Sequence, residues 1–332
     1  MTRATCVEIC AGAGGQALGL ADAGFDHVAA VEIEPDACAT LSLNRPKWDV
    51  LQADIRELNG RDFRGIDLLA GGVPCPPFSV AGHQLGAADE RDLFPDALRL
   101  IREAKPAAVL LENVRGLASK RFGDYRAAVI SELQEAGYHA DWRLVSAADF
   151  HVPQLRPRFI LIAMKARTLR RFEWPTSQGD APTVGDALGD LMARDGWPGA
   201  ALWAENADKI APTLVGGSRK HGGPDLGPTR ARRDWERLGV DGRGIANELP
   251  GPDDPLDVLP RLTLRMAARI QGFPDSWQFF GRKTSVYRQI GNAFPPPVAA
   301  ALGTSILSAL HSTTPKARVK VADRPASLEL VS

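Results

Sequence analysis

The regular alternation of short apolar runs with amphipathic stretches is the feature that most constrains how this chain can fold. Seven runs have the composition of buried strands: TCVEIC, HVAAVE, DVLQAD, IDLLAGG, AAVLLENV, HADWRLVSA and RFILIAM. Helical patterns are expected at about Gly14–Ala23, Pro35–Leu43, Leu93–Glu103 and Asp124–Glu135. Strands separated by helical patterns of about ten to fifteen residues predict an α/β fold, with a mostly parallel sheet that helices cover on both faces.

The pattern changes at about residue 179, where Gly, Pro and Arg become frequent and the periodicity fades. We interpret this segment as a smaller, loop-rich domain, because Trp197, Trp203 and Trp235 give it apolar anchors that a disordered segment lacks. Regular patterning resumes at RLTLRMAARIQGFPDSW, and a last helix is expected after YRQIGNAFPPPV. The expected organisation is a main domain of residues 1–178 and 286–312, a smaller domain of 179–285, and a mobile tail of 313–332.

Composition limits the class of protein. The chain is 44% hydrophobic and 24% charged, which is ordinary for a globular protein. Its four cysteines, Cys6, Cys10, Cys38 and Cys75, match neither paired zinc ligands nor a dense disulfide framework. No basic region followed by an apolar stretch opens the chain, and VAAALGTSILSAL is shorter than the roughly 20 residues that a membrane span needs. We therefore expect a cytoplasmic protein with no structural metal and no membrane segment.

The distribution of charge indicates a polyanionic partner even though the net charge is zero. Residues 1–150 contain 15 Lys and Arg against 22 Asp and Glu, whereas residues 151–332 contain 25 against 18. A basic second part beside an acidic first part is typical of a protein in which one region contacts phosphate groups.

A glycine-rich stretch, ICAGAGGQALGL, follows the first predicted strand and opens the first helix. Its glycines let a ligand approach the backbone at the positive helix N-terminus. Glu32 ends the second strand about twenty residues further on, where a carboxylate can accept hydrogen bonds from ribose hydroxyls. Asp54, after the third strand, is positioned to accept from an adenine amino group. These features predict an adenosine cofactor, without separating a nicotinamide dinucleotide from S-adenosylmethionine.

Reactive side chains follow three further strands. Cys75 lies between Pro74 and Pro76 after the fourth strand, Glu112-Asn113-Val114 ends the fifth, and QLRPRF stands beside another strand end. Because the carboxyl ends of parallel strands meet at one edge, a thiol, an acid and two guanidinium groups are expected to converge. A lone cysteine usually packs as a small hydrophobe, and we keep that interpretation for Cys6, Cys10 and Cys38. Two prolines at a strand end would suit a nucleophile at Cys75, and at this point both packing and nucleophilic roles stay open for it.

These motifs, in this order, resemble those of the DNA (cytosine-5) methyltransferase family of bacterial restriction-modification systems. The resemblance covers the glycine loop, Glu32, Asp54, Pro74-Cys75, Glu112-Asn113-Val114 and Gln154-x-Arg156-x-Arg158. RLTLRMAARIQGFPDSW and QIGNAFPPPVA resemble the last two motifs of the family. The resemblance implies a Rossmann-like methyltransferase domain and makes the smaller domain a target-recognition domain.

The resemblance also implies a reaction. A methyl group passes from S-adenosylmethionine to C5 of a cytosine flipped out of a specific short DNA duplex, leaving S-adenosylhomocysteine. Cys75 adds to C6 of the ring, Glu112 acts at N3, Arg158 holds O2, and Arg156 positions the thiol side of the ring. The protein is expected to act as a monomer and to protect host DNA from a restriction endonuclease that it does not contact.

Further residues are expected to bind the cofactor or DNA. The cofactor set is Cys10, Ala11, Gly12, Gly14, Gly15, Glu32, Ile33, Asp54, Ile55, Pro74, Leu93, Asn292 and Ala293. The DNA set is Ser79, Gln154, Arg219, Lys220, His221, Arg230, Arg232, Arg233 and Arg243. Residues 77–92 are expected to form a lid over the flipped base. The arginines between residues 211 and 247 lead us to expect a target rich in guanine and cytosine.

The sequence departs from the family pattern at three positions. Cys10 stands where Phe usually faces the adenine, Pro76 replaces the Gln that usually follows the nucleophile, and Phe294 replaces a Val. We hypothesise that Phe294 compensates for the small side chain of Cys10.

Three other functions stay open at this point. They are transfer to tRNA cytosine, a non-catalytic DNA-binding regulator, and a nicotinamide dehydrogenase. Intact Cys75, Glu112 and Arg158 argue against the regulator, and the dehydrogenase does not explain the Pro-Cys pair, ENV and the paired arginines together.

Overall fold

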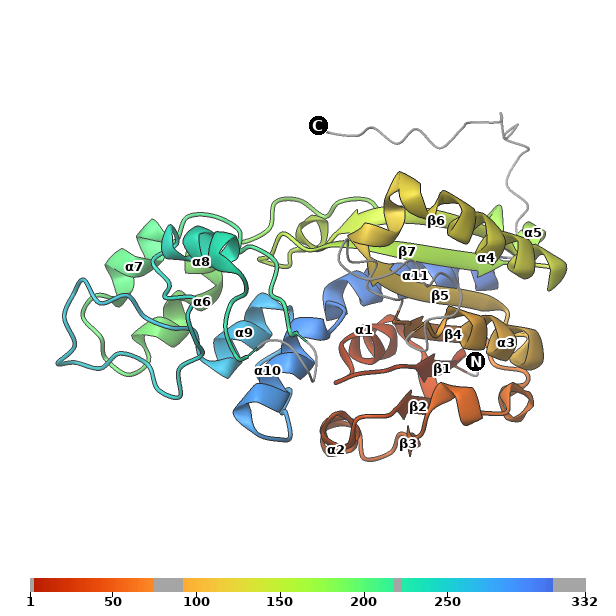
Figure 1. The fold of residues 1–332 in the computed structure, drawn as a ribbon, viewed down its shortest axis with the longest axis horizontal. Helices are drawn as coiled ribbons and strands as arrows, with labels where there is room; N and C mark the ends of the chain where they lie inside the picture. The colour runs from red at the N-terminus through yellow and green to blue at the C-terminus, as the bar shows by residue number, and fades with distance from the viewer. Residues whose placement is uncertain (1–2, 75–91, 218–222, 313–332) are drawn as a thin grey trace.

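The fold is a seven-stranded sheet with helices on both faces, extended at one end by a smaller helical part (Figure 1). The computed structural model describes residues 3–74, 92–217 and 223–312. The strand order is β3-β2-β1-β4-β5-β7-β6. The bounds are β1 (Thr5–Ile9), β2 (Asp26–Glu32), β3 (Val50–Gln52), β4 (Leu68–Gly72), β5 (Ala108–Val114), β6 (His139–Ser146) and β7 (Pro157–Met164).

Six strands run in one direction and β7 runs in the other. The contacts β2 to β3, β1 to β2, β1 to β4 and β4 to β5 are parallel, whereas β7 is antiparallel to both β5 and β6. The prediction of a mostly parallel α/β sheet is confirmed. The QLRPRF motif nevertheless leads into the start of β7 instead of following a strand, because its last three residues begin that strand. It reaches the same edge of the sheet because β7 begins where its neighbours end.

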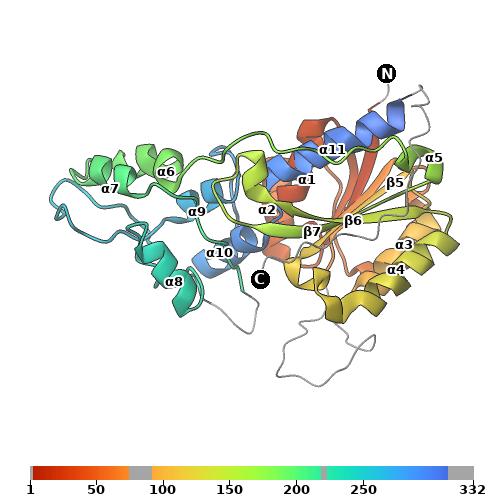
Figure 2. The same cartoon turned by 90° about the horizontal axis from the view of Figure 1, so that it is seen from above.

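Helices cover the two faces of the sheet as expected (Figure 2). α1 (Gly15–Ala23) and α11 (Pro296–His311) pack on one face, with Leu20 and Leu302 in the same apolar cluster as Cys6 of β1. α3 (Phe94–Ala104) and α4 (Gly123–Glu135) pack on the other, where their apolar residues join Ile9. α2 (Pro35–Asn44) follows β2, and the short α5 (Ala166–Leu169) follows β7. The four predicted helices of the first half agree with these bounds to within one residue.

α1 and α11 approach closely because glycine and alanine line their contact. A Cβ atom at Gly19 would lie 2.1 Å from the carbonyl oxygen of Pro296 and 2.7 Å from Cβ of Ala299. A Cβ at Gly303 would lie 2.8 Å from Cβ of Ala23. The C-terminal helix therefore lies directly against the helix that the glycine loop opens.

The smaller part contains more helix than the sequence analysis predicted. Three helices precede the RLTLRMAARIQGFPDSW motif: α6 (Val184–Ala193), α7 (Ala200–Asn206) and α8 (Thr229–Glu236). A fourth, α9 (Leu264–Ile270), lies within that motif. They are short, and neighbouring glycines and prolines hide their periodicity. Local caps stabilise them, as in α6, where the Thr183 side chain and Asp186 form a capping box.

One apolar cluster joins this part to the last motif. Trp197, Trp203 and Trp235 are buried in it, which confirms them as apolar anchors. α10 (Lys283–Asn292) contributes Tyr287 and Ile290 to the same cluster. The sequence analysis placed only one helix at the end of the chain and a domain boundary between 285 and 286. That boundary falls inside α10.

Lys283–His311 has the length and hydropathy of a membrane-spanning helix, the one such stretch in the part of the chain that the structure describes. It consists of α10 and α11, which are separated at Ala293–Pro295. Within its most apolar window, 56% of the residues are buried inside the protein. Its apolar character is that of core helices packed on α1 and the sheet.

Gly19→Ala is expected to lower the free energy of unfolding by about 1–3 kcal/mol, because its methyl group collides with the backbone of Pro296. The matched control is Gly123→Ala at the start of α4, where a Cβ meets nothing within 4 Å. That change should be neutral or stabilise by up to about 1 kcal/mol. Denaturant unfolding of the two variants measures both effects, and equal stabilities would contradict the close contact of α1 with α11.

Candidate active site

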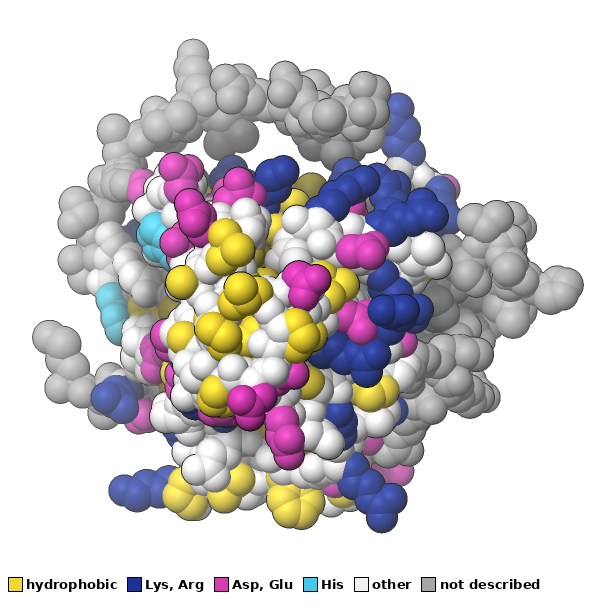
Figure 3. All heavy atoms as spheres, turned by 90° about the vertical axis from the view of Figure 1, so that its left-hand side faces the viewer, with side chains coloured by type: hydrophobic (Ala, Val, Ile, Leu, Met, Phe, Trp, Pro, Cys, Tyr) yellow, Lys and Arg dark blue, Asp and Glu magenta, His cyan; other side chains and the backbone are white. Residues whose placement is uncertain are grey.

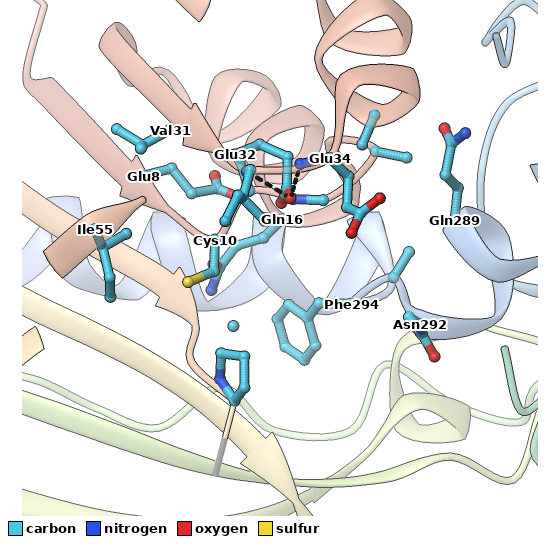
Figure 4. Close-up of a pocket in the computed structure, with 18 of the residues that line it drawn as sticks. Glu8, Cys10, Gln16, Val31, Glu32, Glu34, Ile55, Gln289, Asn292 and Phe294 are labelled. Carbon is cyan, nitrogen blue, oxygen red and sulfur yellow. Dashed lines mark hydrogen bonds between the residues drawn. The ribbon is translucent and has the colours of Figure 1, made fainter. Parts of the chain in front are cut away.

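A cavity of about 480 Å³ opens at the edge of the sheet where six strands end (Figure 4). It is lined by the glycine loop and α1, by the ends of β2, β3 and β4, and by the α10–α11 connection. Most of the residues expected to bind the cofactor lie on its wall: Cys10, Ala11, Gly12, Glu32, Ile33, Asp54, Ile55, Pro74, Leu93, Asn292 and Ala293. The topology therefore brings together groups that are up to about 280 residues apart in the chain.

Gly14 and Gly15 were expected to touch the cofactor, but they are not among the lining residues. Gly14 is the N-cap of α1 with φ 85°, and a side chain there would strike Leu41 and Trp277. A Cβ at Gly15 would lie 2.2 Å from the carbonyl oxygen of Phe294. These glycines shape the loop and let α1 pack, while Gly12, with φ 55°, faces the cavity.

Glu32 is held rigidly at the end of β2. Its Oε2 accepts from Gly12 N at 2.7 Å, and its Oε1 accepts from the backbone N–H groups of Ile33 and Glu34 at 2.8 Å each (Figure 4). Burial raises the pKa of this carboxyl, and the three hydrogen bonds oppose that shift. Oε2 keeps a lone pair for a further donor, whereas Oε1 already accepts two hydrogen bonds. Glu32 is thus a fixed acceptor facing the cavity.

Asp54 is less available than expected. Arg56 holds both of its oxygens, with Nε 3.0 Å from each and Nη2 2.5 Å from Oδ2. The Asp54 side chain also caps the turn Ile55–Glu57 through Arg56 N. The hydrogen bonds from Arg56 lower the pKa of Asp54, although burial opposes them. A ligand amino group at Asp54 therefore shares the carboxylate with Arg56.

Cys10 and Phe294 lie on the same cavity wall, as the hypothesis of compensation requires (Figure 4). Burial and the nearby charges of Glu32 and Asp54 raise the pKa of the Cys10 thiol. Cys10 also has φ 52°, which is uncommon for a residue with a side chain. Cys6, Cys10 and Cys38 are all free thiols.

An ion pair joins Glu112 at the end of β5 to Arg158 at the start of β7. Arg158 Nε lies 2.6 Å from Glu112 Oε1, and both side chains are 12% exposed. The antiparallel register, in which Val114 pairs with Arg158, brings the two side chains to the same edge. Burial lowers the pKa of Arg158 and Glu112 opposes that shift, so the guanidinium stays charged. Glu112 also lines the cavity, close to Gly72.

The backbone on either side of residues 75–91 is fixed beside this ion pair. Asn113 Nδ2 donates to the carbonyl of Val73 at 2.7 Å, and Leu93 N donates to the carbonyl of Pro74 at 3.2 Å. Cys75 follows Pro74 directly in the chain. Cys75, Ser79 and all but the last residue of the expected lid lie outside the described residues, so their expected roles stay predictions.

Gln154 and Arg156 do not face the cavity. Both are fully buried, and Arg156 donates to the carbonyls of Leu214, Gly291 and Ala293 at 2.7–2.9 Å. The amide of Gln154 bonds Leu214 N and Gln271. No polar atom of Gln154 reaches the surface of this structure, and its expected contact with DNA stays a prediction. Arg156 joins β7 to the 211–217 segment and to the α10–α11 connection, and its expected role beside the ring stays a prediction.

Among the expected DNA-reading arginines that the structure describes, Arg230, Arg233 and Arg243 are exposed, and Arg232 and Arg243 form ion pairs. Arg230 and Arg233 of α8, and Arg237 after it, are exposed. Arg232 pairs with Asp225 at 3.3 Å. Asp241 holds Arg243 at 2.9 Å and Arg261 at 2.8 Å. Burial raises the pKa of Asp241, but its hydrogen bonds with Arg243 and Arg261 outweigh this and leave it at about 2.

Basic side chains gather along one side of the smaller part of the molecule, beside a region of hydrophobic and acidic side chains (Figure 3). Arg219, Lys220 and His221 lie outside the described residues. Within residues 3–74, 92–217 and 223–312, no cluster of His, Cys, Asp and Glu could hold a metal ion.

The sequence analysis missed several residues of the wall. Glu8, Gln16, Arg288 and Gln289 line the cavity without having been expected there. Glu8 and Gln16 flank the glycine loop in the sequence, so their place beside it could have been inferred. Arg288 and Gln289 could not, because the helix that carries them was not predicted.

Comparison with known proteins shows similarity along nearly the whole chain. Residues 4–308 match the model of a family described as C-5 cytosine-specific DNA methylase. The Type II methyltransferase M.NaeI of Lentzea aerocolonigenes is 58% identical over 92% of this chain and 75% of its own length. The Type II methyltransferase M.NgoMIV of Neisseria gonorrhoeae is 53% identical over 92% of this chain and 98% of its own length.

Solved structures agree with this similarity. A structure described as a putative DNA modification methyltransferase encoded within a prophage of E. coli aligns with a TM-score of 0.65 and 25% identity, covering 93% of this chain and all of that one. The DNMT2 mutant of Spodoptera frugiperda aligns with a TM-score of 0.65 at 18% identity, over 92% and 99% of the two chains. At that identity the second match shows the shared fold alone.

Proposed function

The chain belongs to the family of C-5 cytosine-specific DNA methylases, and from this premise we propose that it uses S-adenosylmethionine to methylate a flipped cytosine through a covalent adduct of Cys75. It is a DNA (cytosine-5) methyltransferase of the Type II restriction-modification kind. The observation that carries the proposed mechanism is the Glu112–Arg158 ion pair, which lies on the cavity edge beside the fixed backbone of Val73 and Pro74.

The cavity has the chemistry that S-adenosylmethionine requires. Glu32 offers fixed acceptors to the ribose hydroxyls, and Ile33, Ile55 and Leu93 supply apolar surface for the adenine. The glycine loop lets the ligand approach the N-terminus of α1. When bound, S-adenosylmethionine supplies a methyl group on a positively charged sulfur, and S-adenosylhomocysteine remains after transfer.

The protein side chains have distinct roles in the proposed reaction. C5 of cytosine is a weak nucleophile, so the Cys75 thiolate first adds to C6 and places an electron pair on the ring. Glu112, as an acid at N3, stabilises that charge. Arg158 holds Glu112 and donates to O2. C5 then takes the methyl group, a base removes the C5 proton, and the C6–sulfur bond breaks to free Cys75.

The flipped base is needed because C5 and C6 are stacked within a duplex. A glutamate–arginine pair whose side chains are 12% exposed suits this reaction. A site that largely excludes water strengthens the interaction of these side chains with charge that develops on the ring. We propose that the protein works in the cytoplasm as a monomer and meets its partner endonuclease only through their shared DNA.

The identity of the relatives supports a proposal for the target. The matches to M.NaeI and M.NgoMIV each cover 92% of this chain. The part that they leave out is shorter than residues 179–285, so both matches extend into the smaller domain. Six other Type II methyltransferases that match over a similar share are only 32–37% identical. We attribute the higher identity partly to a shared recognition surface, and propose that this chain methylates the same DNA sequence as those two relatives.

Cys75→Ala is expected to abolish methyl transfer while cofactor and DNA binding persist, because the thiol acts in bond formation. The measurement is transfer of tritiated methyl groups to mixed duplex DNA, with tRNA as a second substrate. Duplexes containing 5-fluorocytosine should trap the wild-type protein as a covalent adduct, since fluorine cannot leave as a proton does. Turnover by a folded Cys75→Ala protein, or transfer to tRNA alone, contradicts the proposal.

Plasmid DNA from cells that express the chain is expected to resist the restriction endonucleases of the M.NaeI and M.NgoMIV systems. Plasmid from cells that express Cys75→Ala should be cut, which controls for other host modification. Sequencing of the methylated bases then defines the site. Methylated plasmid that both endonucleases still cut would show that the target differs.

Arg230→Ala and Arg233→Ala are expected to relax discrimination at single base positions, at about 1–3 kcal/mol each, if these exposed side chains read bases. Methylation of a randomised duplex library by each variant measures this. Arg194→Ala, which removes an exposed arginine paired with Asp195 at the end of α6, is the control. A uniform loss over all sequences with a weaker salt dependence means that the arginines hold only phosphates.

A further inference from the structure

Gln16 is a buried glutamine whose side-chain amide has no hydrogen-bond partner among the described residues. It is the second residue of α1 and is 3% exposed, and both Nε2 and Oε1 are without a partner. Buried amides are nearly always bonded, because an unpaired donor or acceptor loses its hydration without replacement. The other buried glutamines, Gln154 and Gln271, follow this rule.

The position of Gln16 places its amide on the cavity wall. Of its neighbours on the helix, Gly15 packs against the α10–α11 connection and Gly19 packs against the start of α11. A residue one position after Gly15 lies about 100° further around the helix, away from α11. Gln16 lines the cavity accordingly, and Figure 4 shows it near Glu8, Cys10 and Glu32.

An amide with both a free donor and a free acceptor matches one part of S-adenosylmethionine. The α-amino-acid end presents a carboxylate, which accepts, and an ammonium group, which donates, on the same carbon. The adenine and ribose do not offer this charged pair, and Glu32 already faces the ribose. A single amide can therefore satisfy Nε2 and Oε1 together on the zwitterion.

The surroundings of Gln16 favour both the carboxylate and the ammonium group of that amino-acid end. The N-terminus of α1 is positive and attracts the carboxylate. Glu8 of β1 is 1% exposed and lines the same cavity. Its Oε2 atom lies 3.4 Å from Nε2 of His27. A carboxylate in this wall attracts an ammonium group.

We propose that Gln16 binds the amino-acid end of S-adenosylmethionine and so holds the sulfur and its methyl group in position. This inference rests on the proposed use of S-adenosylmethionine. Gln16 is a positioning residue in this proposal, because it contacts the part of the ligand that does not react.

Binding of two ligands distinguishes contact of Gln16 with the amino-acid end from a general effect of the substitution on the cavity. S-adenosylhomocysteine has the amino-acid end, whereas 5′-methylthioadenosine has the same adenosine and a thioether but lacks that end. Calorimetry of Gln16→Met should show S-adenosylhomocysteine binding about tenfold to a hundredfold more weakly, as expected for lost hydrogen bonds to charged groups. Binding of 5′-methylthioadenosine should change by less than about twofold.

Thermal unfolding without ligand supplies a second readout. Gln16→Met removes an unpaired buried amide and keeps its length, so the unliganded protein should unfold at the same or a higher temperature. Gln289→Met is the matched control, because Gln289 lines the same cavity but accepts from Thr40 at 2.7 Å and donates to Phe280 at 2.8 Å. Its loss should lower the unfolding temperature without favouring one ligand over the other.

The outcomes distinguish this inference from the proposed function. A wild-type protein that binds neither ligand contradicts the use of S-adenosylmethionine itself. A wild type that binds S-adenosylhomocysteine, together with a Gln16→Met variant that binds it equally well, overturns only the role of Gln16. A variant that loses both ligands equally, or unfolds at a lower temperature, shows a structural glutamine. If Gln16→Met does not fold, the same comparison is made with Gln16→Leu, and failure of both to fold also shows a structural role.

Discussion

The antiparallel pairing of β7 with β5 determines where the polar groups of this protein lie. Because β7 begins where the other strands end, Arg158 lies against Glu112 at the cavity edge. A parallel β7 would carry its first residues to the opposite edge of the sheet, more than 20 Å away at about 3.3 Å per residue over a strand of this length. Removing one partner of such a nearly dry pair costs about 3–5 kcal/mol, so the pair also constrains the sheet.

The same reversed strand anchors the smaller part of the protein. Arg156, two residues before Arg158, is fully buried and donates to carbonyls of Leu214, Gly291 and Ala293. Gln154 and Gln271 extend this network, and Gln271 also donates to the carbonyl of Ala293. Buried hydrogen bonds of this kind favour one arrangement of the chain, although Nε of Arg156 has no partner among the described residues. The 211–217 segment, the α10–α11 connection on the cavity wall and β7 are thereby held in one geometry.

Most of the main domain could be predicted because short stretches of sequence indicate its strands and helices. The stretches LLAGG and AAVLL are apolar throughout, as expected for strands buried on both faces, and the glycine loop directly follows the first of the apolar runs. The direction of β7 was not predictable from periodicity, since a buried strand has the same composition in either direction. The motif order indicated that Glu112 and Arg158 meet, but only the register shows how.

The smaller domain was harder to predict for a different reason. α7 and α8 have only seven and eight residues, and their stability comes from burying Trp203 and Trp235 in a cluster built from distant segments. Helix propensity decides little in such short segments. The burial of Arg156 and Gln154 was missed because alternate charged residues in sequence normally indicate an exposed face. Gln16 could be located from the sequence, but its unpaired amide is visible only once its neighbours are in place.

The close contact of α1 with α11 has a consequence for biosynthesis. The helix α1 leaves the ribosome some 280 residues before α11, which must lie against Gly19, is made. At about 5–20 residues per second, the nascent chain waits on the order of ten seconds or more with the apolar side of α1 uncovered. Assembly of the cofactor cavity is thus necessarily a late event in translation, and a chain truncated before α10 lacks the wall formed by Asn292, Ala293 and Phe294.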